Sequence, residues 1–88
     1  MKPRLNKIQY KRNYIYLIQF TDNKQGEVDL KPFLWGEAFE ELKDENNFKK
    51  AFIDKTTGTI SWPNGSDLAP ETLYKKVISE ASKNAASV

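Results

Sequence analysis

The chain has 88 residues, of which 39% are hydrophobic and 30% are charged, and it contains no cysteine and no histidine. That length allows one domain, and the missing residue types exclude disulfides, Ser-His-Asp triads and metal sites held by Cys or His. The net charge of +2 is too small to imply a polyanionic partner. No apolar run approaches the roughly 20 residues that span a bilayer, and the first residues lack a signal-peptide core. We therefore expect a soluble cytoplasmic protein.

Alternation of polar and apolar residues predicts strands in the first third of the chain. Residues 5–10 alternate, residues 11–13 are polar enough to turn the chain, and residues 14–20 are rich in aromatic and β-branched side chains. Both faces of this second segment are apolar, so we expect a central strand that is at least partly covered on each side. A short third strand follows over residues 27–30, and Pro32 ends it because proline cannot donate to a strand ladder.

The middle of the chain predicts short helical turns followed by a hairpin. Over residues 33–48 the apolar spacing becomes helical, and Asp44 can cap the last turn through its carboxylate. Residues 51–54 and 59–62 then alternate as two strands. Gly58 stands where a hairpin turn with a bulge needs a left-handed residue.

The last part of the chain predicts one amphipathic helix. Leu73 and Val77 lie four residues apart, and Pro70 fits the first turn, where a missing N–H costs nothing. The fold class is therefore α+β: a small, mainly antiparallel sheet of about five strands with two hairpin regions, short helical turns in the middle, and a C-terminal helix on one sheet face. We expect a single domain over residues 1–83 and a frayed tail over residues 84–88.

Carboxylates are the only residues that could supply acid–base chemistry. No phosphate-binding loop and no nucleophile-elbow motif occurs. Asp29, Asp54 and Asp67 fall near strand ends or turns, where an enzyme would need them to converge, but caps and turn hydrogen bonds explain such positions. The acidic loop over residues 22–26 has a lysine at a ligand position and lacks the later glutamate of a calcium loop. We expect no enzymatic activity, no metal and no cofactor.

Basic side chains and tyrosines interleave in the first two predicted strands, a pattern found in proteins that bind nucleic acids. The basic residues are Lys7, Lys11 and Arg12, and the tyrosines are Tyr10, Tyr14 and Tyr16. Packing of a strand face explains the same tyrosine spacing. Nucleic-acid binding through this hairpin is therefore the alternative hypothesis and not the leading one.

The two tryptophans, Trp35 and Trp62, are the side chains whose exposure to water would cost most. We expect both to fill the core, with each indole N–H hydrogen-bonded. An exposed tryptophan would instead be the best candidate for a partner contact, because tryptophan is enriched among interface hot spots.

Ordered motifs link the chain to a family. The most specific run is Gly58-Thr59-Ile60-x-Trp62-Pro63-Asn64-Gly65-x-Asp67-Leu68-x-Pro70-Glu71, and it follows Gly26-Glu27-Val28-Asp29-Leu30-x-Pro32. With these motifs, residues 5–74 resemble the small bacterial family known as domain-of-unknown-function family 2442. The resemblance implies no catalytic residues, because the family has no assigned activity. Some members precede a helix-turn-helix domain and others are encoded beside suspected toxins, which implies an antitoxin-like or regulatory role.

The turn that follows Trp62 has a structural and a functional interpretation. In the structural one, Trp62 fills the core and Asp67 accepts a backbone N–H from the start of the C-terminal helix or from the turn itself. In the functional one, Trp35, Trp62, Asn64 and Asp67 contact a partner. The leading hypothesis is a non-enzymatic interaction domain that binds another small protein encoded nearby, and the sequence does not predict its oligomeric state.

Overall fold

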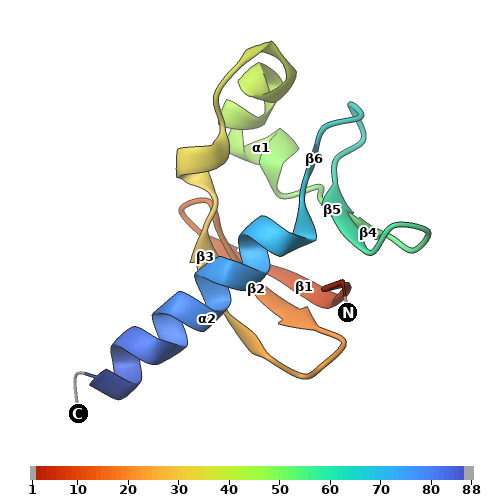
Figure 1. Ribbon diagram of the computed structural model, residues 1–88. Helices are drawn as coiled ribbons and strands as arrows, with labels where there is room; N and C mark the ends of the chain where they lie inside the picture. The colour runs from red at the N-terminus through yellow and green to blue at the C-terminus, as the bar shows by residue number, and fades with distance from the viewer. Residues whose placement is uncertain (1, 87–88) are drawn as a thin grey trace.

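The N-terminal part of the chain forms a three-stranded antiparallel sheet, called sheet A below. The computed structural model describes residues 2–86, with side chains as far as residue 79 (Figure 1). Sheet A comprises β1 (Leu5–Arg12), β2 (Ile15–Phe20) and β3 (Gln25–Asp29) in the order β1-β2-β3. β2 is central, as its composition predicts, and it places Tyr16, Ile18 and Phe20 in the core. Ile15 and Leu17, on its other face, are half-buried.

The turn between β1 and β2 differs from the one predicted at residues 11–13. Asn13 and Tyr14 form it, with φ values of 49° and 66°. Two successive left-handed residues give the two-residue hairpin turn whose twist matches that of the strands. Arg12, predicted as a turn residue, pairs with Ile15 instead, because the outward face of an edge strand tolerates the same polar residues as a turn.

The second half of the chain forms a separate sheet, called sheet B below. It comprises β4 (Phe52–Asp54), β5 (Thr59–Ser61) and β6 (Asp67–Leu68), antiparallel in the order β4-β5-β6. The α+β class and the hairpin are confirmed, and Gly58 has the expected positive φ, at 70°. The single sheet of about five strands is wrong, because the described residues form two sheets of three strands each. β6 has only two residues, too few for an alternation pattern to predict.

Short helical turns connect the two sheets, as the sequence predicts. They are the 3-10 helices η1 (Lys31–Phe33) and η2 (Glu37–Lys43) and the one-turn helix α1 (Glu45–Phe48). Asp44 caps α1 as expected, since its Oδ1 accepts the backbone N–H of Asn46 at 2.9 Å.

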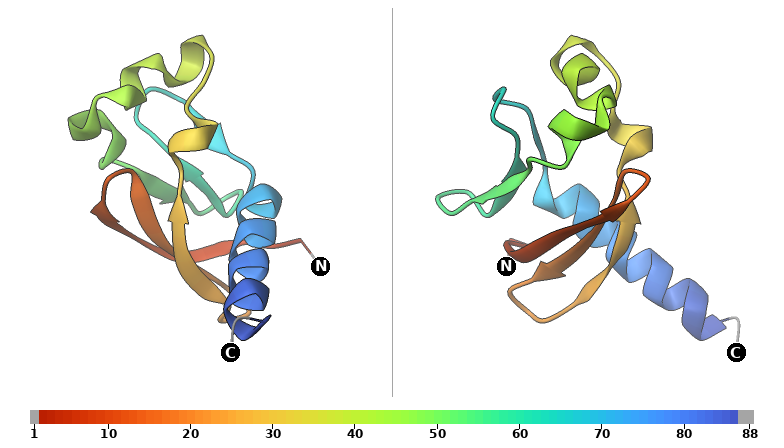
Figure 2. Two further views of the ribbon diagram at one scale, coloured as in Figure 1. Left: turned by 90° about the vertical axis from the view of Figure 1, so that its left-hand side faces the viewer. Right: turned by 180° about the vertical axis from the view of Figure 1, so that it is seen from behind.

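The C-terminal helix α2 (Pro70–Ala86) begins at the predicted proline. It packs along β3 through Leu73 and Val77, both buried, and its C-terminal end lies far from η2 and α1 (Figure 2). α2 includes residues 84–86 of the expected tail, and residues 87–88 lie outside the described chain. In the described chain, none of the helices combines the length and the apolar content needed to cross a membrane.

Arg4 and Leu5, where β1 begins, join the two sheets. The backbone N–H of Leu5 donates to the Gly58 carbonyl at 2.9 Å, and the Arg4 guanidinium donates to the Lys55 carbonyl at 2.7 Å. The Arg4 carbonyl accepts the backbone N–H of Thr21, at the end of β2, at 2.9 Å. Arg4 therefore bonds to sheet A through its backbone and to the β4–β5 turn through its side chain.

The carbonyl of Phe48 is a second link between the sheets. It accepts hydrogen bonds from the Tyr16 hydroxyl at 2.8 Å and from the Trp62 Nε1–H at 2.7 Å. All three residues are at most 2% exposed, and the Phe48 and Trp62 rings stack with centroids 5.6 Å apart. Burial raises the pKa of Tyr16 to about 12, because the phenolate would lose its hydration. One donor comes from β2 and the other follows β5, so this buried carbonyl fixes the two sheets against each other.

Candidate functional site

Trp35 is on the surface, contrary to the prediction that it fills the core. It lies between η1 and η2 and is 76% exposed, whereas its neighbour Leu34 is buried. The reason is the local backbone. The Trp35 N–H donates to the Phe33 carbonyl at 3.0 Å, and Gly36 takes a left-handed φ of 87°, so the chain turns sharply after η1. That turn leaves room in the core for Leu34 and directs the indole into solvent.

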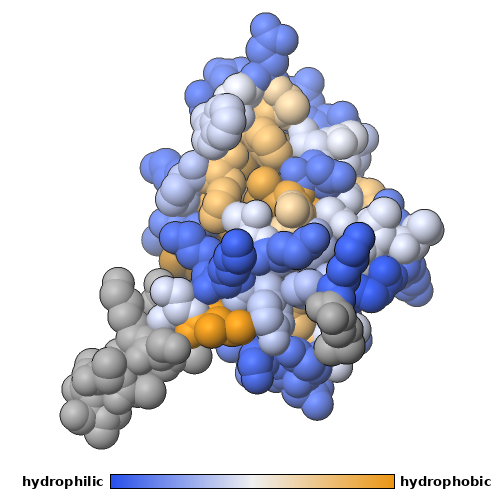
Figure 3. All heavy atoms as spheres, viewed as in Figure 1, coloured by the Kyte–Doolittle hydropathy of each residue, from blue (hydrophilic) through white to orange (hydrophobic). Residues whose placement is uncertain are grey.

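An apolar groove adjoins Trp35. Its volume is about 330 Å³, and its lining residues are Phe33, Trp35, Gly36, Glu37, Ala38, Phe39, Asp67, Leu68 and Ala69. One side therefore comes from the segment between η1 and η2, and the other comes from β6 and the start of α2. Figure 3 shows apolar surface in this region, between the η1–η2 segment and β6, with hydrophilic groups on both sides. The groove contains two of the four candidate interaction residues, Trp35 and Asp67.

The turn after Trp62 supports one wall of this groove. Trp62 is 1% exposed, which confirms the prediction for this tryptophan. Asn64 is exposed, but its Nδ2 donates to the Ala38 carbonyl at 3.2 Å, and the Ser66 hydroxyl donates to the same carbonyl at 2.5 Å. The Asn64 Oδ1 also accepts the backbone N–H of Ser66 at 3.0 Å. Asn64 and Ser66 therefore position Ala38. Neither Trp62 nor Asn64 lines the groove itself.

Asp67 does not form the cap that the sequence suggests. It is exposed and pairs with Ser61 across β5 and β6, whereas the first α-helical hydrogen bond of α2 runs from the Leu73 N–H to the Ala69 carbonyl, at 3.4 Å. Within the described residues its carboxylate accepts no hydrogen bond. Strand pairing keeps Asp67 extended and leaves Ala69 as the residue directly before the helix. The carboxylate faces the groove region without a structural partner.

The basic residues of the first hairpin lie on the outside of β1. Lys7 and Lys11 are exposed, and the Arg12 guanidinium lies 3.7 Å from the Glu27 carboxylate. The tyrosines are elsewhere: the rings of Tyr10, Tyr14 and Tyr16 pack around Phe48. Tyr16 is buried, and Tyr10 and Tyr14 are half-buried against Phe48, so the rings that would stack on bases are turned towards the core and the three basic side chains are exposed.

The aspartates considered as acid–base groups have separate local roles. Asp29, in sheet A, accepts the backbone N–H of Lys31, and Asp54, in sheet B, accepts that of Thr56, both at 2.9 Å. Each carboxylate thus stabilises the turn that follows its own strand. Asp67 lines the groove apart from both. Among the described residues, no three acidic side chains gather as metal ligands would.

Two further hollows are explained by packing. One, of about 350 Å³, is lined by Tyr14, Lys31, Leu34 and Lys43. Both of its lysines already have partners: the Lys31 ammonium lies 5.6 Å from the centre of the Tyr14 ring, and the Lys43 ammonium lies 3.1 Å from the Glu40 carboxylate.

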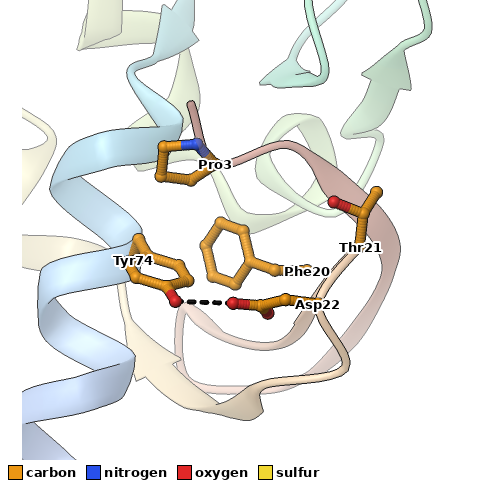
Figure 4. A pocket seen from close by; sticks show the side chains of 5 residues that line it. All are labelled: Pro3, Phe20, Thr21, Asp22 and Tyr74. Atoms are coloured by element: carbon orange, nitrogen blue, oxygen red, sulfur yellow. Dashed lines mark hydrogen bonds between the residues drawn. The ribbon is translucent and has the colours of Figure 1, made fainter. Parts of the chain in front are cut away.

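The other hollow, of about 60 Å³, lies between the β2–β3 turn and α2 (Figure 4). The Tyr74 hydroxyl donates to the Asp22 carboxylate across it at 2.5 Å. This hydrogen bond lowers the pKa of Asp22 and raises the pKa of Tyr74. The Tyr74–Asp22 hydrogen bond holds the β2–β3 turn against α2. The hollow beside it is too small for a ligand of more than a few atoms.

The groove was missed from the sequence because its two sides are about 30 residues apart in the chain. The helical spacing over residues 33–48 predicts only local turns for Phe33 and Phe39, and no pattern in the sequence links either residue to Leu68. One feature of the sequence does indicate that Trp35 is exposed. Trp35 lies between Pro32 and Gly36, and both residue types favour turns, which lie at protein surfaces.

The fold and this site define a small α+β domain with an apolar groove open to solvent. Residues 5–79 match the model of the family described as protein of unknown function (DUF2442), and the chain belongs to that family. The match confirms the resemblance inferred from the sequence motifs. No curated protein and no solved structure matches the chain significantly.

Proposed function

We propose that this chain is a non-enzymatic interaction domain that binds another small protein in the cytoplasm. The partner is encoded nearby, and the role is antitoxin-like or regulatory. The groove beside Trp35 is the contact surface.

The observation that carries the proposal is the exposure of Trp35. Leaving a large aromatic side chain 76% exposed sacrifices the stabilisation that its burial would give, which is about 1.5–3 kcal/mol for a large apolar side chain. Tryptophan is also the residue most enriched among interface hot spots, and a contiguous apolar patch marks an interaction surface more often than a scattered apolar residue does. Trp35 is not scattered, because it adjoins Phe33, Phe39 and Leu68 in one groove.

The framework of the groove favours binding over chemistry. Side chains of the signature turn, Asn64 and Ser66, hold Ala38 in place, so the wall formed by η2 is set before any partner arrives. A pre-formed wall lowers the ordering cost of association. The groove residues supply two carboxylates, and they include no nucleophile with a general base beside it. This composition supports a non-enzymatic role.

Copurification with the product of the neighbouring gene tests the proposal. We expect the two proteins to elute together in native size-exclusion chromatography, and we expect Trp35→Ala to abolish the complex. The matched control is Ile78→Ala, since Ile78 is a large apolar residue that is 38% exposed on α2, outside the groove. Separate elution of the two wild-type proteins would count against the proposal, as would equal loss with both variants.

Nucleic-acid binding through Lys7, Lys11 and Arg12 remains the competing proposal for the basic hairpin. It predicts an affinity for DNA or RNA that falls steeply with salt and weakens in Lys11→Glu. Undetectable binding at low salt would eliminate it.

A further inference from the structure

We infer that the groove accepts a cationic side chain, arginine above all, which an apolar segment of the partner protein presents. This inference rests on the proposed function, because it names the chemistry of the partner that the groove would bind.

The charges of the groove are of one sign. Its ionisable lining residues are Glu37, from η2, and Asp67, from β6, and both are exposed. Within the described chain neither carboxylate has an ion-pair or hydrogen-bond partner, whereas the nearby Glu40 is paired with Lys43 at 3.1 Å. Two unpaired negative charges thus reach the groove from two different elements.

A partner that covers Trp35 must also cover these carboxylates. Glu37 follows Trp35 by two residues, and Asp67 lies on the opposite side of the same groove. A purely apolar partner would remove water from both charges without compensation, which is strongly unfavourable. An acidic partner would add repulsion. A positive group in the groove replaces the lost hydration with ion pairs, so the groove selects for a cation.

The indole strengthens that selection. A cation over the face of tryptophan gains more than over any other aromatic ring, and Trp35 leaves its ring in solvent. Arginine suits the site better than lysine because its planar guanidinium can stack on the indole and pair with a carboxylate at the same time. Phe33, Phe39 and Leu68 would contact the aliphatic stem and its apolar neighbours.

A second copy of this chain is the competing occupant. The first 12 residues contain five basic residues and no acid. Arg4, however, is bonded to the Lys55 carbonyl within its own chain, and Arg12 lies 3.7 Å from Glu27. Both arginines of this segment thus have partners within their own chain. An arginine from a different protein is therefore the better ligand for the groove.

Two matched peptides test the inference by NMR of the ¹⁵N-labelled protein. The probe is a blocked hexapeptide of alternating leucine and arginine, and its control replaces each arginine with citrulline, a neutral analogue of the same shape. The arginine peptide should move the indole N–H signal of Trp35 and leave that of the buried Trp62 in place. The citrulline peptide should bind at least tenfold more weakly. The double variant Glu37→Gln/Asp67→Asn should bind the arginine peptide at least tenfold more weakly than the wild type, with the Trp62 signal unchanged as evidence of an intact fold.

Three results would overturn the inference: no Trp35 shift with the arginine peptide, equal binding of the two peptides, or unchanged binding to the double variant. Movement of the Trp35 signal when the protein alone is diluted would identify a second copy as the occupant and overturn it as well. Copurification separates the two proposals. A complex that is lost with Trp35→Ala but kept with Glu37→Gln/Asp67→Asn would refute the cationic partner and leave the proposed function standing.

Discussion

The shared acceptor at Phe48 predicts that two substitutions will destabilise the protein by more than their sum. Tyr16→Phe and Trp62→Phe each remove one donor from the Phe48 carbonyl and leave the other in place. Tyr16→Phe should therefore cost about 1 kcal/mol, the usual net worth of one hydrogen bond. Trp62→Phe should cost about 2 kcal/mol, because part of the buried indole volume is lost as well.

The double variant leaves a fully buried carbonyl with neither donor. An unsatisfied buried acceptor costs about 1–3 kcal/mol, so the double variant should exceed the sum of the single variants by at least about 1 kcal/mol. Urea unfolding followed by far-UV circular dichroism measures all four proteins. Sodium sulfate in every sample keeps the double variant folded, because this salt strengthens the burial of apolar surface.

The matched control pairs Trp62→Phe with Tyr74→Phe. Tyr74 loses a hydrogen bond to Asp22, which is unrelated to Phe48, so this pair should be additive within about 0.5 kcal/mol. The same additivity for Tyr16→Phe with Trp62→Phe would refute the reasoning, since it would mean that another donor or water reaches the carbonyl.

Three further predictions concern stability. Because the pKa of Tyr16 rises to about 12 on folding, the neutral phenol stabilises the fold below pH 10, and up to about 2–3 kcal/mol is lost as the pH rises from 10 to 12. This loss exceeds the cost of about 1 kcal/mol expected for Tyr16→Phe, so the urea midpoint of the wild type should start above that of the variant and fall below it within this range; parallel curves would contradict this. Asp44→Ala should cost about 0.5–2 kcal/mol as a lost cap, whereas Asp67→Ala should stay within about 0.5 kcal/mol in the same thermal melts; equal losses would be evidence that Asp67 is a cap. Gly36→Ala should cost about 1–3 kcal/mol, because its φ of 87° with a ψ of 164° is a conformation that is essentially confined to glycine. Gly58→Ala should also lower the melting temperature, because its φ is positive and its new Cβ would lie 2.8 Å from the Arg4 Cβ; an unchanged melting temperature would refute the clash.

Local patterns predicted the elements well because each depends on residues that are near one another in sequence. The alternation around Ile18, the cap at Asp44 and the left-handed Gly58 are all properties of a few consecutive residues, and all are present in the structure. The prediction for Tyr14 failed because a tyrosine next to β-branched residues resembles a strand, while the two-residue turn needs a positive φ there.

The division into two sheets and the groove could not be predicted in this way. Both depend on which distant segments meet, and β6 becomes a strand only because β5 lies beside it. The fate of Trp35 shows the same limit. A tryptophan is usually buried, but the backbone after η1 directs the Leu34 side chain into the core and the Trp35 side chain into solvent.

The bonds of Arg4 across the two sheets have a consequence for the order of folding. The strands of sheet A pair with their sequence neighbours, whereas Arg4 reaches partners 51 and 52 residues away. The strands of sheet B also pair with their sequence neighbours. Closing a loop of the length that Arg4 spans costs more chain entropy than closing a short turn, so the two sheets should dock late, after their own strands have paired. The groove has one side before sheet B and the other in β6, so it is completed in that late step. A molecule that binds the groove therefore binds only the fully folded chain, and mass action makes it a stabiliser of that fold.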